Sequence, residues 1–162
     1  MEVRQLMTDN PDSCTIDQTA NEAARIMWER DCGVVPVLEN GRVAGIVTDR
    51  DICMAAYFHG EPLTRISLAD MMTRDICCVR PEDDLTEAEH IMQERQVRRL
   101  PVVDKGGMLV GMLSLGDVAQ TVGRPNGQST KKLGNGACET DQELLATVAA
   151  VSTPRLDTRQ SA

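Results

Sequence analysis

A seven-residue pattern ending in an aspartate occurs twice in the chain, at residues 45–51 and 111–117. Each copy has a glycine, two apolar residues, a hydroxyl residue (Thr48 or Ser114), two variable residues and then the aspartate. The hydroxyl falls where a strand is expected to become a helix, and the aspartate lies one helical turn later on the same side. Because a helix N-terminus has free N–H groups and a positive dipole end, this position favours an anion such as phosphate.

The aspartate of each pattern, Asp51 or Asp117, adds a second chemical function. A carboxylate one turn into a helix can accept hydroxyl protons from a ribose, as acidic residues do in dinucleotide sites. The same residue types also cap helices without any ligand, and for one copy alone capping is the better explanation. The occurrence of both copies at matched positions favours a nucleoside-phosphate site.

The two patterns belong to a longer internal repeat. Met7-Thr8 recurs as Met72-Thr73, and Pro36-Val37 recurs as Pro101-Val102, both with an offset of 65 residues. After one extra residue in the turn at Lys105-Gly106, the offset becomes 66. A period of this length is one supersecondary unit copied once, and two related units usually pack together with clefts between them.

Each repeat is expected to contain a strand, a helix, two strands joined by a hairpin, and a second helix. In the first repeat, a capping box at Thr19–Glu22 starts a helix that ends before Gly33. Strands are expected at 34–38 and 43–47, with a helix from 48 to about 58. In the second repeat, the pattern predicts strands at 77–79, 100–104 and 108–113, a helix capped by Asp84, and a closing helix at 114–122.

The predicted organisation is a first unit at 1–60 and a second at 61–122. A glycine-rich flexible linker is expected at 123–137, and a C-terminal helix with a frayed tail at 138–162. The only tryptophan, Trp28, lies on the first helix but off its most apolar face. It is either an interface residue or simply an exposed one.

Composition excludes several function classes. The chain has a net charge of −8 and one residue each of Trp, Tyr and Phe, so it has neither the basic surface nor the aromatic platforms of nucleic-acid binding. No secretory signal and no apolar run of about 20 residues is visible, which predicts a cytoplasmic protein that does not enter a membrane. The six cysteines form no C-x-x-C pair, and buried reduced thiols are expected.

The Met-Thr entry, the helix with Ile-Met, the Pro-Val strand and the Gly-x-x-[Thr/Ser]-x-x-Asp pattern together resemble the cystathionine-beta-synthase (CBS) domain, present twice over about residues 3–122. The resemblance implies an α/β fold in which two β-α-β-β-α repeats form a pseudo-two-fold (Bateman) module, here with a C-terminal helical extension. It implies a non-catalytic regulatory module that binds AMP, ADP, ATP, NAD or S-adenosylmethionine in clefts between its units. It further implies a homodimer, with a regulated protein still to be identified and no required cofactor.

The resemblance also implies the residues that contact nucleotide. Asp51 and Asp117 would bind ribose, and Thr48 and Ser114 would bind ribose or phosphate. The remaining positions lie at the strand entries, before or at the Pro-Val strands, or inside the motif: Cys14, Val35, Pro36, Arg50, Val79, Arg98, Arg99 and Pro101.

The two repeats differ in where they carry basic residues. The first has Arg50 inside its motif, whereas the second has Arg98 and Arg99 before its Pro-Val strand. Arginine makes bidentate contacts to phosphate, so the two clefts should bind with unequal affinity. The alternatives are that Arg98 and Arg99 are a solvated surface pair and that Arg50 forms an ion pair with a neighbouring aspartate.

Two other functions stay open. A thiol- or metal-responsive sensor would use cysteine, with His59 or His90, as its input on the same scaffold. A purely structural dimerisation module would leave both clefts empty. No cysteine lies in a recognisable motif with a histidine, so no catalytic residue is expected.

Overall fold

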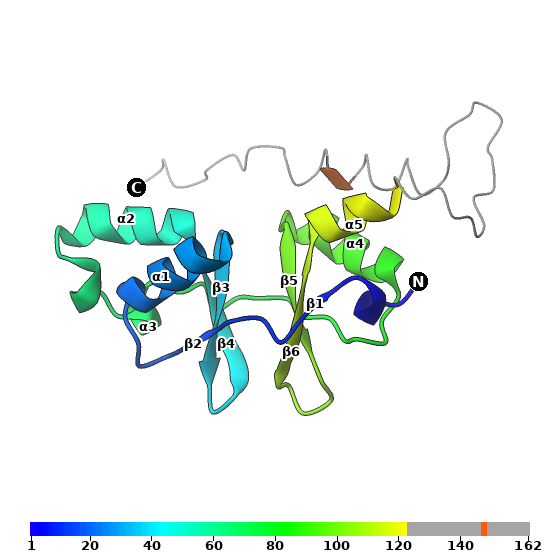
Figure 1. Cartoon of the computed structure of the whole chain (residues 1–162), viewed down its shortest axis with the longest axis horizontal. Helices are drawn as coiled ribbons and strands as arrows, with labels where there is room; N and C mark the ends of the chain where they lie inside the picture. Colours follow the sequence, from blue (N-terminus) through cyan, green and yellow to red (C-terminus); the bar gives the residue numbers. More distant parts are fainter. Residues whose placement is uncertain (123–146, 149–162) are drawn as a thin grey trace. The chain divides into compact units, whose positions relative to one another are not determined.

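The chain alternates strands and helices, and the computed structural model describes residues 1–122 and 147–148 (Figure 1). The strands are Thr8–Asp9 (β1), Cys14–Thr15 (β2), Val34–Glu39 (β3), Arg42–Thr48 (β4), Arg99–Val103 (β5) and Leu109–Ser114 (β6). The helices are Ala20–Arg30 (α1), Asp49–His59 (α2), Leu68–Met71 (α3), Leu85–Arg95 (α4) and Leu115–Val122 (α5), with short 3₁₀ helices at Val3–Gln5 and Leu63–Arg65. The first repeat therefore has the predicted order, as β2, α1, β3, β4 and α2.

The second repeat keeps this order in α4, β5, β6 and α5 but differs at its first strand. The predicted strand at 77–79 is wrong, because only Val79 pairs, through a single parallel bridge to Val102. Val79 donates to the Pro101 carbonyl at 3.0 Å and accepts from the Val103 N–H at 2.9 Å. In the first repeat, both residues of β2 pair with β3, which has six residues. In the second repeat, Val79 forms its single bridge to β5, which has five residues.

The strands form two three-stranded sheets, with the orders β2-β3-β4 and β1-β6-β5. β2 runs parallel to β3, and β3 is antiparallel to β4. The β3–β4 hairpin turns at Asn40 and Gly41, whose φ angles of 52° and 80° are the left-handed values that a tight two-residue turn requires. The predicted hairpin is therefore confirmed.

Each Met-Thr segment pairs with a strand of the other repeat. Thr8 in β1 lies opposite Met112 of β6. Thr73 forms an antiparallel bridge with Ile46 of β4, and the two residues exchange backbone hydrogen bonds of 3.0 and 2.9 Å. Because Thr8 matches Thr73 and Ile46 matches Met112 in the repeat, the two pairings are equivalent.

The first helix of each repeat starts at a predicted cap. The N–H and hydroxyl of Thr19 both donate to the Glu22 carboxylate, at 3.0 and 2.5 Å, and the hydroxyl bond lowers the pKa of Glu22. Asp84 accepts from the Thr86 N–H at 3.0 Å, which lowers the pKa of Asp84. Both caps favour the ionised carboxylate and fix where α1 and α4 begin.

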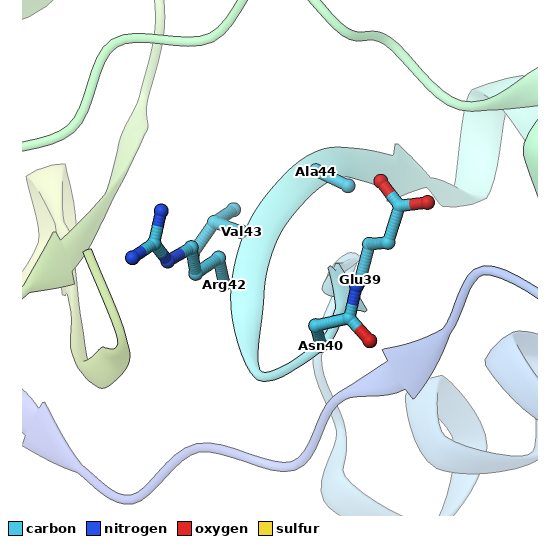
Figure 2. Close-up of a pocket in the computed structure, with 5 residues that line it drawn as sticks. All are labelled: Glu39, Asn40, Arg42, Val43 and Ala44. Atoms are coloured by element: carbon cyan, nitrogen blue, oxygen red, sulfur yellow. The ribbon is translucent and has the colours of Figure 1, made fainter. Parts of the chain in front are cut away.

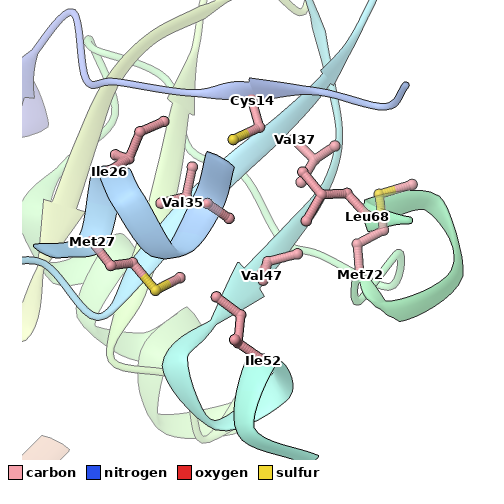
Figure 3. Close-up of a cluster of buried hydrophobic side chains, with 10 residues drawn as sticks. Cys14, Ile26, Met27, Val35, Val37, Val47, Ile52, Leu68 and Met72 are labelled. Atoms are coloured by element: carbon pink, nitrogen blue, oxygen red, sulfur yellow. The ribbon is translucent and has the colours of Figure 1, made fainter. Parts of the chain in front are cut away.

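Aliphatic side chains from β2, β3 and β4 pack with those of α1, α2 and α3 (Figure 3). This core contains Cys14, Ala23, Ile26, Met27, Val35, Val37, Val47, Ile52, Leu68 and Met72. The buried residues of α1 are Ala20, Ala23, Ile26 and Met27, which recur at helical spacing on one face. Because this core has no aromatic side chain, its stability comes from many small apolar contacts.

The chain divides into two compact units that do not follow the repeat boundary. One contains Thr8–Pro81 and Pro101–Met112, and the other contains Met1–Met7, Glu82–Leu100 and the described residues from Leu113 onward. One unit contains Thr48 and Asp51, and the other contains Ser114 and Asp117.

The predicted linker at 123–137 lies outside the described residues, as does most of the predicted segment at 138–162. Within that segment Thr147 and Val148 are helical. Among the described residues, no helix combines the length and apolar character needed to cross a bilayer.

Candidate functional site

The first motif lies where β4 becomes α2. Thr48 is the N-cap of the helix, and its hydroxyl accepts from the Asp51 N–H at 3.2 Å. The Asp51 Oδ2 accepts from the Thr48 N–H at 2.8 Å and from the Thr48 hydroxyl at 2.7 Å. All three bonds close a reciprocal capping box, so the capping role that the sequence left open is confirmed for this copy.

The second motif, where β6 becomes α5, has the same geometry. The Asp117 Oδ2 accepts from the Ser114 N–H at 2.8 Å and from the Ser114 hydroxyl at 2.7 Å, and the Asp117 N–H donates back at 3.1 Å. These bonds engage Oδ2 in both motifs, which leaves the other oxygen, Oδ1, as the atom that would accept from a ligand hydroxyl. Capping and ligand binding are therefore compatible.

The packing around Gly45, which opens the first motif, explains why this residue is a glycine. A Cβ added at Gly45 would lie 2.8 Å from the Thr73 carbonyl oxygen, because the Met72-Thr73 segment pairs with β4 at this point. Only a residue without a side chain allows this approach.

In both repeats, the residue before the Pro-Val strand forms a backbone hydrogen bond with the first residue of the second helix. The Gly33 carbonyl accepts from the Asp49 N–H at 3.3 Å, and the Arg98 carbonyl accepts from the Leu115 N–H at 2.9 Å. These are matched pairs, so the backbone of Arg98 lies beside its motif as that of Gly33 does. Sequence alignment alone does not reveal this contact.

Two positions, one beside the helix start and one inside the motif, carry glycine and arginine in opposite order in the two repeats. The first repeat has Gly33 beside the helix start and Arg50 inside the motif, whereas the second has Arg98 beside the helix start and Gly116 inside the motif. Each motif thus has an arginine next to it, presented from a different backbone position, and the second repeat has Arg99 in addition.

The arginine side chains are available to a ligand. Arg50 and Arg98 are exposed, and Arg99 is half-buried. None of the three forms an ion pair within the described part of the chain. The alternative in which Arg50 pairs with a neighbouring aspartate is therefore wrong for the guanidinium, and only the Arg50 N–H contacts Asp49, at 2.7 Å.

The other predicted contact residues form the buried framework behind the motifs. Cys14, Val35, Pro36, Val79 and Pro101 are all buried. Both backbone groups of Val79 are used in pairing with β5. That Cys14, Val35, Pro36 and Pro101 contact a ligand stays a prediction. Because their side chains are buried, such contacts would come mainly from their backbone groups.

A separate hollow of about 500 Å³ lies at the β3–β4 hairpin (Figure 2). It is lined by Glu39, Asn40, Arg42, Val43 and Ala44, none of which was predicted as a site residue. Arg42 and Thr48 are at opposite ends of β4, roughly 20 Å apart for a strand of that length. We place the candidate chemistry at the motifs, because the hollow has no matched counterpart of the hydroxyl-aspartate pair.

The cysteines differ in accessibility. Burial raises the pKa of Cys14 to about 11 and also raises the pKa of Cys78, so both stay protonated thiols at neutral pH. Cys53 is exposed. Across residues 1–122 and 147–148, no group of three or more His, Cys, Asp or Glu side chains is placed to hold a metal ion.

Comparison with known proteins identifies the fold family. The model of the CBS domain matches the chain twice, at residues 3–57 and 68–124. The CBS domain-containing protein YhcV of Bacillus subtilis (strain 168) is 34% identical over 117 residues, which are 72% of this chain and 82% of that protein.

The solved structures that are similar to this chain include two with bound groups. The crystal structure of CBSX2 in complex with AMP has a TM-score of 0.65 and 26% identity, and the match covers 75% of this chain and 95% of that one. The structure of Hypoxic Response Protein I with two coordinated zinc ions has a TM-score of 0.67 and 28% identity, covering 74% and 98%. Since the family model matches far more than half of the chain, this protein belongs to the CBS domain family and contains the domain as a tandem pair.

Proposed function

We propose that the chain is a non-catalytic regulatory module whose two motifs bind adenosine-containing nucleotides. The observation that carries the proposal is the matched pair of helix starts, each with a hydroxyl-aspartate cap and one unpaired arginine beside it. The likeness to CBSX2, whose structure contains AMP, supports adenosine as the nucleoside.

Each part of the ligand has a matching group in the motif. The aspartate Oδ1 would accept from a ribose hydroxyl, while Oδ2 keeps the cap intact. The helix N-terminus and the adjacent arginine would bind phosphate. Because the cation is Arg50 in one repeat and Arg98 in the other, phosphorylated ligands such as AMP, ADP and ATP should bind better than S-adenosylmethionine, which has no phosphate.

Binding would act by shifting the population between two shapes of the module, which requires the ligand to prefer one of them. The segment at 123–162 is the candidate responsive element. Gln93 of α4 donates to the Thr147 hydroxyl at 2.6 Å, so this segment contacts the second repeat directly. Deletion of residues 123–162 should change assembly or partner binding, and an unchanged result in both would remove the segment from the mechanism.

A calorimetric titration of the full chain with AMP, ADP, ATP, NAD, S-adenosylmethionine and GMP tests the proposal. Adenine nucleotides should bind, GMP should not, and Arg50→Gln and Arg98→Gln should each weaken one class of site. Arg65→Gln is the matched control, because Arg65 is an exposed arginine in the 3₁₀ helix Leu63–Arg65 and belongs to neither motif. Absence of binding by every nucleotide would overturn the proposal.

A thermal-shift assay with zinc and with a chelator should accompany the titration, because the likeness to Hypoxic Response Protein I motivates a metal-responsive alternative. A rise in melting temperature with zinc alone, abolished by chelator, would favour that alternative over the nucleotide proposal. A protein that responds to neither would fit a structural dimerisation module with empty clefts.

A further inference from the structure

Asp49, the first residue of α2, places its side chain at the start of its own helix. The Asp49 Oδ1 accepts from the Arg50 N–H at 2.7 Å. The Asp49 N–H donates to the Gly33 carbonyl at 3.3 Å. The Asp51 N–H donates to the Thr48 hydroxyl at 3.2 Å. All three N–H groups of the first turn therefore have acceptors within the protein, and one of these acceptors is a carboxylate.

The second motif has an apolar residue at the matched position. Leu115 corresponds to Asp49, and the Leu115 N–H donates to the Arg98 carbonyl at 2.9 Å. In the described part of the chain, no side chain accepts from the N–H of Gly116, which is exposed. Because the first N–H groups of a helix have no acceptor inside that helix, the Gly116 N–H can donate to a ligand oxygen.

The formal charges of the two motifs also differ in sign. The first motif, residues 45–51, contains two aspartates and one arginine, which leave a net charge of −1. The second motif, residues 111–117, contains one aspartate, and the adjacent Arg98 and Arg99 bring its net charge to +1. The residues matched to these two arginines in the first repeat are uncharged, Gly33 and Val34.

An anionic ligand therefore meets different surroundings at the two helix starts. At the second motif, the open N–H, the positive end of the helix dipole and two arginines all attract phosphate. At the first motif, the Asp49 carboxylate accepts from the N–H that a phosphate would use, and its charge repels the phosphate. Arg50 offsets one negative charge, which suits a single phosphate, but each further phosphate adds charge that no other arginine of this motif offsets.

We infer that Asp49 is a specificity-determining residue that restricts the first motif to nucleotides with one phosphate, whereas the second motif also accepts the diphosphate and triphosphate. The inference rests on the proposed binding of adenosine nucleotides at both motifs, and it adds which nucleotide each motif takes. The full chain should therefore bind two molecules of AMP but only one molecule of ATP with comparable affinity.

Calorimetric titration of the full chain in magnesium-free buffer tests the inference by counting sites. The wild type should bind two AMP and one ATP per chain, with a second ATP bound at least about tenfold more weakly. Asp49→Leu, which copies the second motif, should bind two ATP with similar affinity. Leu115→Asp, which copies the first motif, should bind ATP about tenfold more weakly than the wild type does.

Asp49→Asn separates the charge of this side chain from its hydrogen bond, because the amide oxygen can still accept from the Arg50 N–H. This variant should recover most of the ATP affinity at the first motif, and added salt should shrink its difference from the wild type. Glu61→Gln is the control, because it removes one negative charge from an exposed residue that belongs to neither motif. The control should bind one ATP, as the wild type does.

The outcomes distinguish this inference from the proposed function. Two ATP sites of equal affinity in the wild type, or an unchanged number of ATP sites in both Asp49 variants, would overturn the inference and leave nucleotide binding intact. A wild type that binds neither AMP nor ATP would overturn the proposed function and this inference with it.

Discussion

In the first repeat, a glycine lies beside the helix start and Arg50 lies within the motif; in the second, Arg98 lies beside the helix start and a glycine lies within the motif. The capping bonds agree between the two motifs within about 0.1 Å. The parts that build the helix start are therefore alike. The exposed arginine side chains, which form no ion pair with the described residues, differ in position. Function can diverge at such positions without disturbing the fold.

The largest expected effects test whether the shared scaffold folds as one. Val47 and Leu113 are matched, fully buried strand residues. Leu113→Ala should cost about 2–5 kcal/mol of unfolding free energy and Val47→Ala less, because a smaller side chain leaves a smaller cavity. Since strands cross between the repeats, urea unfolding should show one transition in both variants. Two separate transitions would mean that the repeats fold independently.

The next effect tests whether the exchanged arginines are equivalent. Arg50→Gln should weaken AMP binding at the first motif about tenfold, the loss expected for a charge-assisted hydrogen bond. Adding Gly33→Arg to Arg50→Gln copies the arrangement of the second repeat and should restore affinity to within about threefold. Calorimetry measures both. A double variant that binds no better than Arg50→Gln would show that the two arginine positions serve different roles.

A smaller effect tests the caps themselves. Thr48→Val and Ser114→Ala each remove a hydroxyl that bonds the aspartate and its N–H. Each should lower the unfolding free energy by about 1 kcal/mol, and the two losses should be similar because the geometries match. If thermal unfolding shows a loss at only one motif, the two helix starts are not energetically equivalent.

The smallest effect concerns Cys14, whose matched residue in the second repeat is Val79. Burial raises the pKa of Cys14 from 9.0 to about 11, so the folded state holds its proton longer than the unfolded state. The stability from this thiol is complete below pH 9 and declines as the pH rises toward 11. Denaturant titrations should show the decline in the wild type and a shallower one in Cys14→Val. Equal slopes would mean that other groups control alkaline stability.

Much of this architecture follows from local sequence signals. The capping boxes at Thr19 and Thr48 and the Asn40-Gly41 turn are each decided by a few neighbouring residues, and the structure confirms them. Helix α3 and strand β1 were missed, because elements of four and two residues show no periodicity. The strand expected at 77–79 depends on how much of β5 is available to pair, which is a tertiary property.

The candidate site was predictable to a similar degree. The hydroxyl-aspartate motifs are local, so their geometry could be anticipated from residue types and spacing. That Arg98 lies beside its motif depends on a hydrogen bond between residues on two different elements, which spacing does not reveal. The hollow at the β3–β4 hairpin gave no sequence signal.

The crossing of the Met-Thr segments also has a consequence for synthesis on the ribosome. Thr8 pairs with Met112, so Thr8 leaves the exit tunnel about a hundred residues before its partner. At about 5–20 residues per second, that interval is roughly 5–20 s. During that time Thr8 lacks this partner, and the two repeats can complete each other only after Met112 has been synthesised.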